Sequence, residues 1–367
     1  MTDKPIGLYI HIPFCRSKCP YCDFYSMRID EGLKQEYIEA VKREIQKSDC
    51  IFDTVYFGGG TPSQLKSQEI AEILSVVSHT DNCEITVECN PSDTGRENSI
   101  FDFDVLASAG VNRISMGLQS AVDGERKALG RLSGKEEVLN AINKCHKAGI
   151  DNISLDLMLG IPYQTIESLN ESVSFCINSG VKHISAYLLK IEDNTYFGKN
   201  RDKLILPDED TVSDMYLTVS ETLRNNGFNH YEISNFSLPG YESKHNCKYW
   251  ECKEYLGIGP SAHSFIDGKR LYYDNDINKF ISEPELIYDD KGGSLEEYIM
   301  LGLRLSKGIN FCDIKQKYSY NFNDGFIDYC RFLQDKNLLN LTENGFALTP
   351  EGFLLSNSVI CELTDRL

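Results

Sequence analysis

Residues 9–24 read YIHIPFCRSKCPYCDF, an apolar run that leads into a loop with three cysteines. Cys15, Cys19 and Cys22 stand in the spacing C-x3-C-x2-C, and no fourth cysteine lies nearby in the sequence. A structural zinc ion usually takes four protein ligands, whereas a [4Fe–4S] cluster held by three thiolates keeps one iron open. The loop therefore predicts an iron–sulfur cluster with an open iron. A zinc site completed by His11 or by a remote residue is the alternative.

Short β-rich runs alternate with amphipathic stretches from the N-terminus to about residue 190. Repeated strand–helix units of this kind build a parallel sheet with helices outside. We therefore expect an α/β fold whose core is a partial (β/α)6 barrel of the TIM type. The strands are expected at 7–12, 53–59, 84–89, 112–118, 152–159 and 183–189, and helices at 33–48, 67–80 and 136–149, the last ended by Gly149.

The alternation weakens beyond about residue 200, where a smaller α+β domain of a winged-helix-like kind is expected. Its signature is a pair of helices followed by a short hairpin and a last helix. The division of the chain is expected at residue 235, which gives two domains, 1–235 and 236–367. The expected elements are a helix at 208–227, one strand at 230–237, helices at 295–305 and 323–337, and a hairpin at 338–349.

The composition is that of a soluble globular protein, with 41% apolar and 25% charged residues. The formal net charge of −18 repels phosphate backbones, so nucleic acid is not expected as a partner. No signal peptide pattern and no apolar run of the ~20 residues that a membrane span needs are present, which predicts a cytoplasmic protein without a transmembrane segment. Its 13 cysteines are then expected to be thiols and metal ligands rather than disulfides.

Chemically unusual residues stand at the end of each predicted strand: the cysteine loop, GGGTP at 58–62, Glu88 with Asn90 and Pro91, Gln119, Asp156, and the segment after AYLL at 186–189. The carboxyl ends of parallel barrel strands open onto one face, where active sites are built. We therefore expect these residues to share one site. The alternatives are a plain tight turn for GGGTP, solvated loop carboxylates for the acids, and a surface salt bridge for Arg131.

With these motifs in place, the chain resembles the radical S-adenosylmethionine (SAM) family. Its signature is C-x3-C-x2-C with an aromatic residue before the last cysteine, which is Tyr21 here. The resemblance implies that the open iron chelates SAM, and that the reduced cluster splits SAM into methionine and a 5′-deoxyadenosyl radical. It also implies an electron donor for the cluster. Whether this chain cleaves SAM productively stays open.

Further motifs narrow the resemblance to the coproporphyrinogen III dehydrogenase-like group, and they cover nearly the whole chain. They include YFGGGTPSQL, VECNPSD, ISMGLQS, DLMLGIPYQT and GIGPSAHSF. The resemblance implies that 1–235 is the radical SAM core barrel and that 236–367 is a HemN-type C-terminal domain. The SAM contacts that it implies are Tyr9, Tyr21, Gly59, Gly60, Thr61, Glu88, Gln119, Arg131, Asp156, Lys190 and His263.

Several features favour the heme chaperone branch of this group, HemW, over the dehydrogenase. Phe24 stands where the dehydrogenase has a further cysteine, and Ser133 stands where the group often has histidine. The dehydrogenase carries a long N-terminal extension, whereas eight residues precede Tyr9 here. HNCKYW at 245–250 fits the H-N-x-x-Y-W motif linked to heme binding. The heme contacts that it implies are His245, Asn246, Tyr249 and Trp250.

The resemblance thus implies a radical SAM heme chaperone that binds heme and transfers it to acceptor proteins. The alternative is the oxygen-independent coproporphyrinogen III dehydrogenase, whose activity we do not expect in this chain. A neutral imidazole is a good axial ligand for heme iron, which gives His245 a chemical role. A satisfied surface histidine and an apolar contact between domains are the alternatives for HNCKYW.

Overall fold

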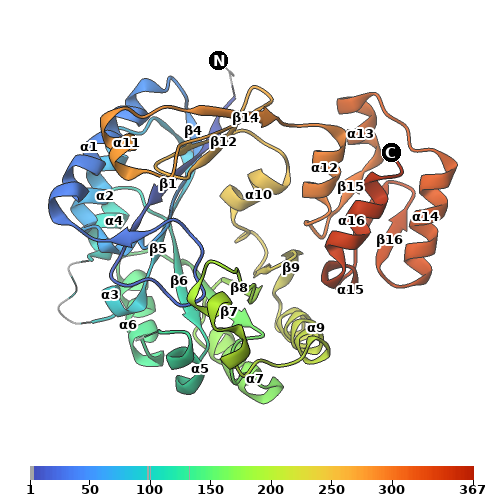
Figure 1. Cartoon of the computed structure of the whole chain (residues 1–367), viewed down its shortest axis with the longest axis horizontal. Helices are drawn as coiled ribbons and strands as arrows, with labels where there is room; N and C mark the ends of the chain where they lie inside the picture. The colour runs from blue at the N-terminus through green and yellow to red at the C-terminus, as the bar shows by residue number, and fades with distance from the viewer. Residues whose placement is uncertain (1–3, 97–98, 100, 132) are drawn as a thin grey trace.

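Six parallel strands form the centre of the structure, a computed structural model that describes residues 4–96, 99, 101–131 and 133–367. Each strand pairs in parallel with the next one along the chain, and the set curves into a partial barrel (Figure 1). The predicted partial (β/α)6 barrel is confirmed. Its strands are β1 (Ile6–Ile12), β4 (Phe52–Gly59), β5 (His79–Cys89), β6 (Arg113–Gln119), β7 (Asn152–Leu159) and β8 (His183–Leu188).

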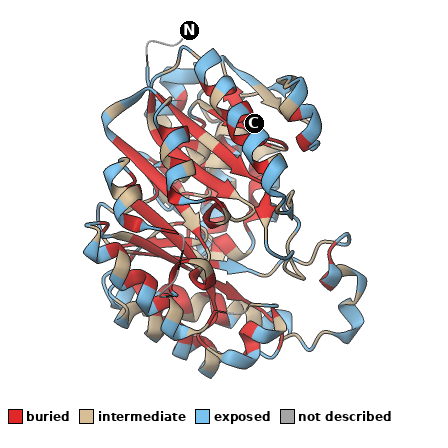
Figure 2. Cartoon of the chain, turned by 90° about the vertical axis from the view of Figure 1, so that its left-hand side faces the viewer, coloured by how far each residue is buried: buried red, intermediate tan, exposed pale blue. Residues whose placement is uncertain are grey.

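Helices cover the outside of the barrel, and their outer faces are exposed while the strands beneath are buried (Figure 2). The longest are amphipathic, which turns one apolar face of each toward the sheet. The helices of this region are α1 (Glu31–Lys47), α2 (Ser67–Leu74), α3 (Pro91–Thr94), α4 (Phe103–Ser108), α5 (Asp123–Ala128), α6 (Lys135–Lys147), α7 (Ile166–Asn178), α8 (Tyr196–Lys199) and α9 (Glu209–Asn225).

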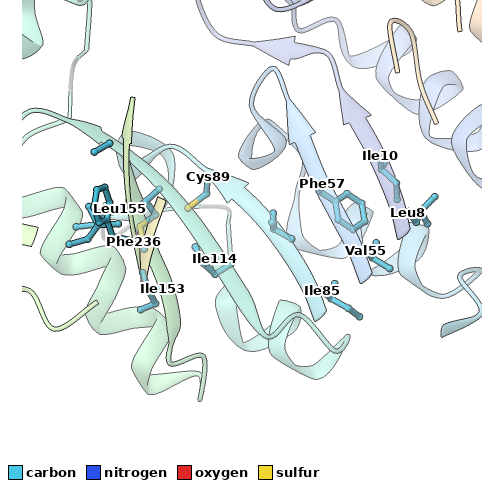
Figure 3. Close-up of a cluster of buried hydrophobic side chains, with 14 of the residues drawn as sticks. Leu8, Ile10, Val55, Phe57, Ile85, Cys89, Ile114, Ile153, Leu155 and Phe236 are labelled. Atoms are coloured by element: carbon cyan, nitrogen blue, oxygen red, sulfur yellow. The ribbon is translucent and has the colours of Figure 1, made fainter. Parts of the chain in front are cut away.

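Alternate residues of the barrel strands supply the apolar core between sheet and helices. Leu8 and Ile10 of β1 and Val55 and Phe57 of β4 are fully buried there (Figure 3). Because successive side chains of a strand point to opposite faces, the residues between them face the barrel interior. That interior is polar and aromatic. Tyr9, Thr54, Tyr56, Glu84, Glu88, Arg113, Ser154, Asp156 and His183 lie at such positions.

The predicted bounds of one helix and one strand were wrong. The helix expected at 67–80 ends at Leu74, because β5 already begins at His79, which pairs with Phe52. The single strand expected at 230–237 is a hairpin of β9 (Asn229–Glu232) and β10 (Asn235–Ser237). Its turn is held by the Glu232 carboxylate, which accepts a hydrogen bond from the Ser234 amide at 3.1 Å.

The sheet continues beyond both edges of the barrel. On the β8 side it adds β10 and then β9, and on the β1 side it adds a parallel strand, β11 (Tyr255–Ile258). Strands β12 (His263–Ile266), β13 (Lys269–Tyr272) and β14 (Ile287–Lys291) extend that edge in antiparallel fashion. The sheet therefore contains strands from both sides of residue 235. The domain boundary expected at that residue stays a prediction.

The remaining C-terminal elements form a lobe beside the barrel (Figure 1). The predicted hairpin is confirmed, and it lies in a three-stranded sheet of order β15-β17-β16. No helix in the described ranges is long and apolar enough to cross a membrane. The lobe comprises α12 (Leu295–Gly302), β15 (Ile309–Asn310), α13 (Phe311–Tyr318), α14 (Asp324–Asp335), β16 (Leu339–Thr342), β17 (Gly345–Leu348), α15 (Pro350–Leu354) and α16 (Ser356–Thr364).

Four short elements complete the set of strands and α-helices in the described residues. Strands β2 (Phe14–Cys15) and β3 (Met27–Arg28) pair and flank the cysteine loop. Helix α11 (Ile277–Ser282) packs beside α1. Helix α10 (Lys244–Trp250) holds the HNCKYW segment and lies between the barrel and the C-terminal lobe (Figure 1).

Candidate functional site

A cavity of about 420 Å³ lies at the carboxyl ends of the barrel strands. It gathers residues that are far apart in the sequence, as expected for the open face of a parallel barrel. Most of the predicted cluster and SAM residues line it. They are Cys15, Cys19, Tyr21, Cys22, Gly59, Gly60, Thr61, Glu88, Gln119, Arg131 and Asp156.

The three cysteines of the loop turn their thiols toward this cavity. The loop is closed by a hydrogen bond from the Cys22 amide to the Cys19 carbonyl at 3.1 Å, and Cys15 Sγ lies 3.4 Å from Thr61 Oγ1. Burial raises the pKa of the Cys15 and Cys22 thiols, so a metal must displace their protons on binding. Three partly exposed thiols around one cavity fit the three ligands of a [4Fe–4S] cluster.

His11 does not join the cysteines. Its Nδ1 lies 3.0 Å from the Tyr9 hydroxyl and its Nε2 lies 2.9 Å from the Tyr25 carbonyl oxygen, so both ring nitrogens are engaged elsewhere. Within the described ranges, no three His, Cys, Asp or Glu side chains are arranged to hold a single metal ion. The geometry thus gives no support to a zinc site completed by His11.

The glycine turn after β4 is pressed against the end of β1. Gly59 has φ of +105°, and a Cβ there would lie 2.4 Å from the His11 ring. A Cβ on Gly60 would lie 2.7 Å from the Ile12 carbonyl oxygen, to which the Gly60 amide donates at 2.8 Å. Only glycine fits this close approach, and it leaves backbone rather than side chains facing the cavity.

Two half-buried carboxylates line the cavity. Glu88 accepts a hydrogen bond from the Tyr56 hydroxyl at 2.7 Å, and burial raises its pKa to about 7. Asp156 accepts one from the Ser115 hydroxyl at 3.3 Å, and burial raises its pKa to about 6. These groups are not solvated loop carboxylates. A buried acid calls for a cationic or hydrogen-bonding partner, and the ammonium, sulfonium and ribose hydroxyls of SAM are of that kind.

Gln119 and Arg131 also line the cavity, over Gly117, which pairs with Asp156 in the sheet. Gln119 has φ of +68°, a conformation that costs energy in any residue other than glycine and is concentrated at functional sites. Arg131 Nε donates to the Tyr21 hydroxyl at 3.2 Å, so the arginine belongs to the cavity rather than to a surface ion pair. Both pack over Gly117, where a Cβ would lie 2.7 Å from Gln119 Nε2 and 3.1 Å from an Arg131 nitrogen.

Three predicted SAM residues do not line this cavity. Tyr9 lies deeper in the barrel, with its hydroxyl on His11. Lys190 is exposed and pairs with Glu192 at 2.5 Å. His263 is exposed at the start of β12 and stacks on Tyr272, with ring centroids 5.7 Å apart. Their roles toward SAM stay predictions.

The HNCKYW helix lies at the other end of the barrel. The backbone amides of Lys244 and His245 donate to the Glu84 carboxylate at 3.2 and 3.1 Å. The His245 side chain is fully buried, with Nδ1 2.8 Å from Thr54 Oγ1 and Nε2 2.7 Å from the Tyr249 hydroxyl. It is therefore a satisfied histidine, but an interior one rather than a surface one.

The last residue of HNCKYW, Trp250, lies toward the C-terminal lobe. Trp250 lies under the guanidinium of Arg304, which is 4.9 Å from its ring centroid, so it contacts the C-terminal lobe. Asn246 is half-buried near the start of the helix. None of the four predicted heme residues lines the cavity that holds the cysteines, so any heme site that uses them is separate from it.

Sequence reasoning missed Asp93. Its carboxylate accepts hydrogen bonds from Gln64 Nε2 at 2.7 Å and Ser63 Oγ at 3.1 Å, and it lies 3.5 Å from the Arg16 guanidinium. Asp93 stands in VECNPSD, just after a strand, so its position carried a usable signal. The other unpredicted residues of the cavity wall include Ser92, Ser115, Met158 and Tyr187.

Comparison with known proteins agrees with this geometry. Residues 9–176 match the Radical SAM superfamily and residues 294–355 match the HemN C-terminal domain. The solved structure of coproporphyrinogen III oxidase (HemN) from Escherichia coli superimposes with a TM-score of 0.81 at 21% identity, over 98% of this chain and 90% of that one. It therefore has the same fold.

Relatives of similar length are heme chaperones HemW. The protein of Lactococcus lactis subsp. lactis (strain IL1403) is 35% identical over 372 residues, which cover 98% of this chain and 97% of the relative. That of Bacillus subtilis (strain 168) is 32% identical over 371 residues, which cover 96% and 97%. With a radical SAM barrel, a HemN-type C-terminal segment and end-to-end similarity of this degree, the chain belongs to the radical SAM superfamily and, within it, to the HemW family.

Proposed function

We propose that this chain is a heme chaperone, which binds heme and passes it to acceptor proteins while carrying a [4Fe–4S] cluster and SAM. The observation that carries the proposal is its end-to-end similarity to proteins named as heme chaperones. We expect it to act in the cytoplasm, because each of its 13 cysteines is a free thiol, which suits a reducing compartment.

The cluster and SAM belong in the cavity at the carboxyl end of the barrel. Cys15, Cys19 and Cys22 would hold the cluster, which when bound and reduced by an electron donor would supply an electron to SAM. Glu88 and Asp156 hold the cationic part of SAM or its ribose hydroxyls. The glycine backbone at 59–60 lies against the methionine portion, and Gln119 and Arg131 orient the remaining polar groups.

A second cavity offers room for heme. It measures about 700 Å³ and lies between the end of the barrel, α10 and the C-terminal lobe. That size and position, between two structural units, are typical of ligand pockets. Leu305, Leu348 and Phe353 are buried apolar residues in its wall, which suit a porphyrin ring. Arg224 and Lys307 also line it and can meet propionates, although Lys307 pairs with Glu251 in the same wall.

Helix α10 contributes to this second cavity through Cys247 and Glu251. His245 points the other way, into the barrel, so iron ligation by His245 requires α10 to turn. Cys247 is already in place, and a cysteine thiolate is an established heme ligand type. We therefore propose the second cavity as the heme site and α10 as the source of its iron ligand, with His245 and Cys247 as the two candidates.

The test is heme binding and coproporphyrinogen turnover measured in parallel on anaerobically reconstituted protein. We expect heme at about one per chain, its transfer to an added apo-hemoprotein, and no decarboxylation of coproporphyrinogen III in the presence of SAM and reductant. Multiple turnovers of decarboxylation without heme binding would overturn the proposal and install the dehydrogenase. The dehydrogenase is kept as the alternative function because the predicted SAM cavity contains the cysteines, glycines and acids expected for SAM binding.

A further inference from the structure

Three side chains in contact, Glu88, Tyr56 and His245, lead through the barrel from the SAM cavity to α10. We call these three side chains the column. It starts at Glu88, which lines the cavity and accepts the Tyr56 hydroxyl at 2.7 Å. The Tyr56 ring stacks on the His245 ring of α10, with centroids 5.2 Å apart and an interplanar angle of 27°. Tyr56 thus touches a residue of the proposed SAM site with its hydroxyl and the HNCKYW segment with its face.

The α10 end of this column is firmly fixed. The His245 ring is held on both nitrogens, by Thr54 and by Tyr249, and the two backbone amides at the start of the helix are held by Glu84. A displacement of Tyr56 therefore cannot be absorbed by the imidazole alone, because close-packed interiors transmit shifts rather than absorb them. It has to be passed to the helix.

The cavity end of the column carries a titratable group, the Glu88 carboxyl. Glu88 is half-buried, and desolvation raises its pKa to about 7, so in the ligand-free protein the carboxyl is partly protonated near neutral pH. A bound cation favours the carboxylate, which is the stronger acceptor for the Tyr56 hydroxyl. Arg113 lies in the same interior, with Nε and Nη1 that have no hydrogen-bond partner among the described residues, and its charge also acts on Glu88.

Tyr9 does not provide the same link. Its ring lies beside both Tyr56 and His245, with centroids 6.3 and 6.5 Å away, but its hydroxyl is engaged by His11. The direct connection from the carboxylate to α10 therefore passes through Tyr56.

We infer that Tyr56 is a positioning residue that transmits occupancy of the SAM cavity to helix α10. The inference rests on the proposed function, since that function assigns SAM to this cavity and heme handling to α10. SAM in the cavity holds Glu88, Tyr56 and His245 in one arrangement and keeps α10 docked against the barrel. Departure of SAM loosens α10 and frees the helix that borders the second cavity. By linkage, a ligand that moves α10 changes SAM affinity by the same factor.

The chain carries its own reporter for this coupling, because Trp250 on α10 is the only tryptophan in the sequence. The cluster-loaded protein is titrated with SAM, with binding measured by equilibrium dialysis and α10 followed by Trp250 emission and by hydrogen exchange of the amides at 244–250. In the unmodified protein SAM shifts the emission and slows exchange by about fivefold or more. In Tyr56→Phe, SAM still binds but both α10 signals stay flat.

Tyr273→Phe is the matched control, because Tyr273 is a buried tyrosine whose hydroxyl donates to another carboxylate, Glu44, at 3.0 Å. It keeps the full SAM response. Thr54→Val probes the column from its α10 end, remote from the cavity, and should bind SAM normally with a reduced α10 response. If Tyr56→Phe fails to fold or to bind SAM, the α10 response of Thr54→Val tests the inference instead.

The possible outcomes separate cleanly. An unmodified protein that binds SAM without any α10 response overturns the inference, and so does a Tyr56→Phe or Thr54→Val variant that responds like the unmodified protein. An unmodified protein that binds no SAM at all instead removes the SAM part of the proposed function. Heme binding, measured separately, decides the rest of that function.

Discussion

The carboxylate of Asp93 and the guanidinium of Arg16 lie 3.5 Å apart, which joins the end of β5 to the cysteine loop. The Asp93 side chain is only 8% exposed, whereas that of Arg16 is 60% exposed, so the aspartate is the fixed partner. Gln64 and Ser63 hold it from the glycine turn. One side chain thus connects three of the segments that form the proposed cluster and SAM site.

Loss of this connection should loosen the cluster. In Asp93→Ala the loop loses its anchor, and two donors, the buried Ser63 and the half-buried Gln64, lose their acceptor at a cost of about 1–3 kcal/mol. We expect faster loss of iron to a chelator, measured from the decay of the iron–sulfur absorption. Asp208→Ala, which removes an exposed N-cap acceptor of α9, is the control and should keep the normal rate. Equal rates in the two variants would show that Asp93 does not support the loop.

Substitution of any cysteine of the loop should abolish the cluster. Cys15→Ala, Cys19→Ala and Cys22→Ala each remove one of three thiolate ligands, and iron and sulfide per chain should fall to background after reconstitution. Cys312→Ala, at an exposed thiol on α13, should retain them. A triple variant of the loop that still bound about four irons would place the cluster elsewhere.

The glycine turn should not tolerate a side chain. In Gly60→Ala the new Cβ meets the Ile12 carbonyl oxygen, so the turn must move away from β1. We expect weaker SAM binding, by about tenfold, together with a lower melting temperature, since overpacking of this kind costs about 1–3 kcal/mol. Gly124→Ala on α5 is the control, because nothing lies within 4 Å of the added Cβ. Normal SAM affinity in Gly60→Ala would contradict the placement of SAM.

SAM affinity should rise with pH. The pKa values of Asp156 and Glu88 are raised to about 6 and about 7, so both acids are largely neutral at pH 5 and ionised at pH 8. A cationic ligand favours the ionised forms, and its affinity should increase across this window. Glu88→Gln should flatten the upper part of the profile. A pH-independent affinity in the unmodified protein would argue that neither acid meets the cation.

The same acids affect the ligand-free fold with the opposite sign. Their pKa values in the folded state lie above the ordinary values, so their contribution to stability is complete at low pH and is lost as the pH rises through about 6 to 7. SAM should therefore raise the melting temperature more at pH 8 than at pH 5.5, which differential scanning calorimetry can measure.

The two candidate heme ligands on α10 can be told apart. If Cys247 binds iron from its present position, Cys247→Ala should shift the Soret band and weaken binding by about tenfold or more, while His245→Ala changes the spectrum little. The reverse result would show that α10 turns to present His245. Cys361→Ala, at an exposed thiol on α16, controls for adventitious binding to thiols.

The strands and the residues at their carboxyl ends were predictable from the sequence, because apolar alternation marks buried strands and chain order marks a parallel barrel. Asp156 and Gln119 lie where that reasoning put them. The position of α10 was not predictable in the same way. His245 contacts Thr54 and Glu84, which are 191 and 161 residues away, and no local pattern encodes such pairs. The early end of α2 was missed because the first residues of β5 are polar.

The seat of α10 against the amino ends of the barrel strands covers the end of the barrel opposite the SAM cavity. Lys248 pairs with Asp53 at 2.8 Å, and its side chain lies so close to Gly7 that a Cβ there would be 3.0 Å away. With that end covered, the carboxyl face is the side from which SAM and an electron donor are expected to approach the cysteines. The two approaches would therefore share one face of the barrel.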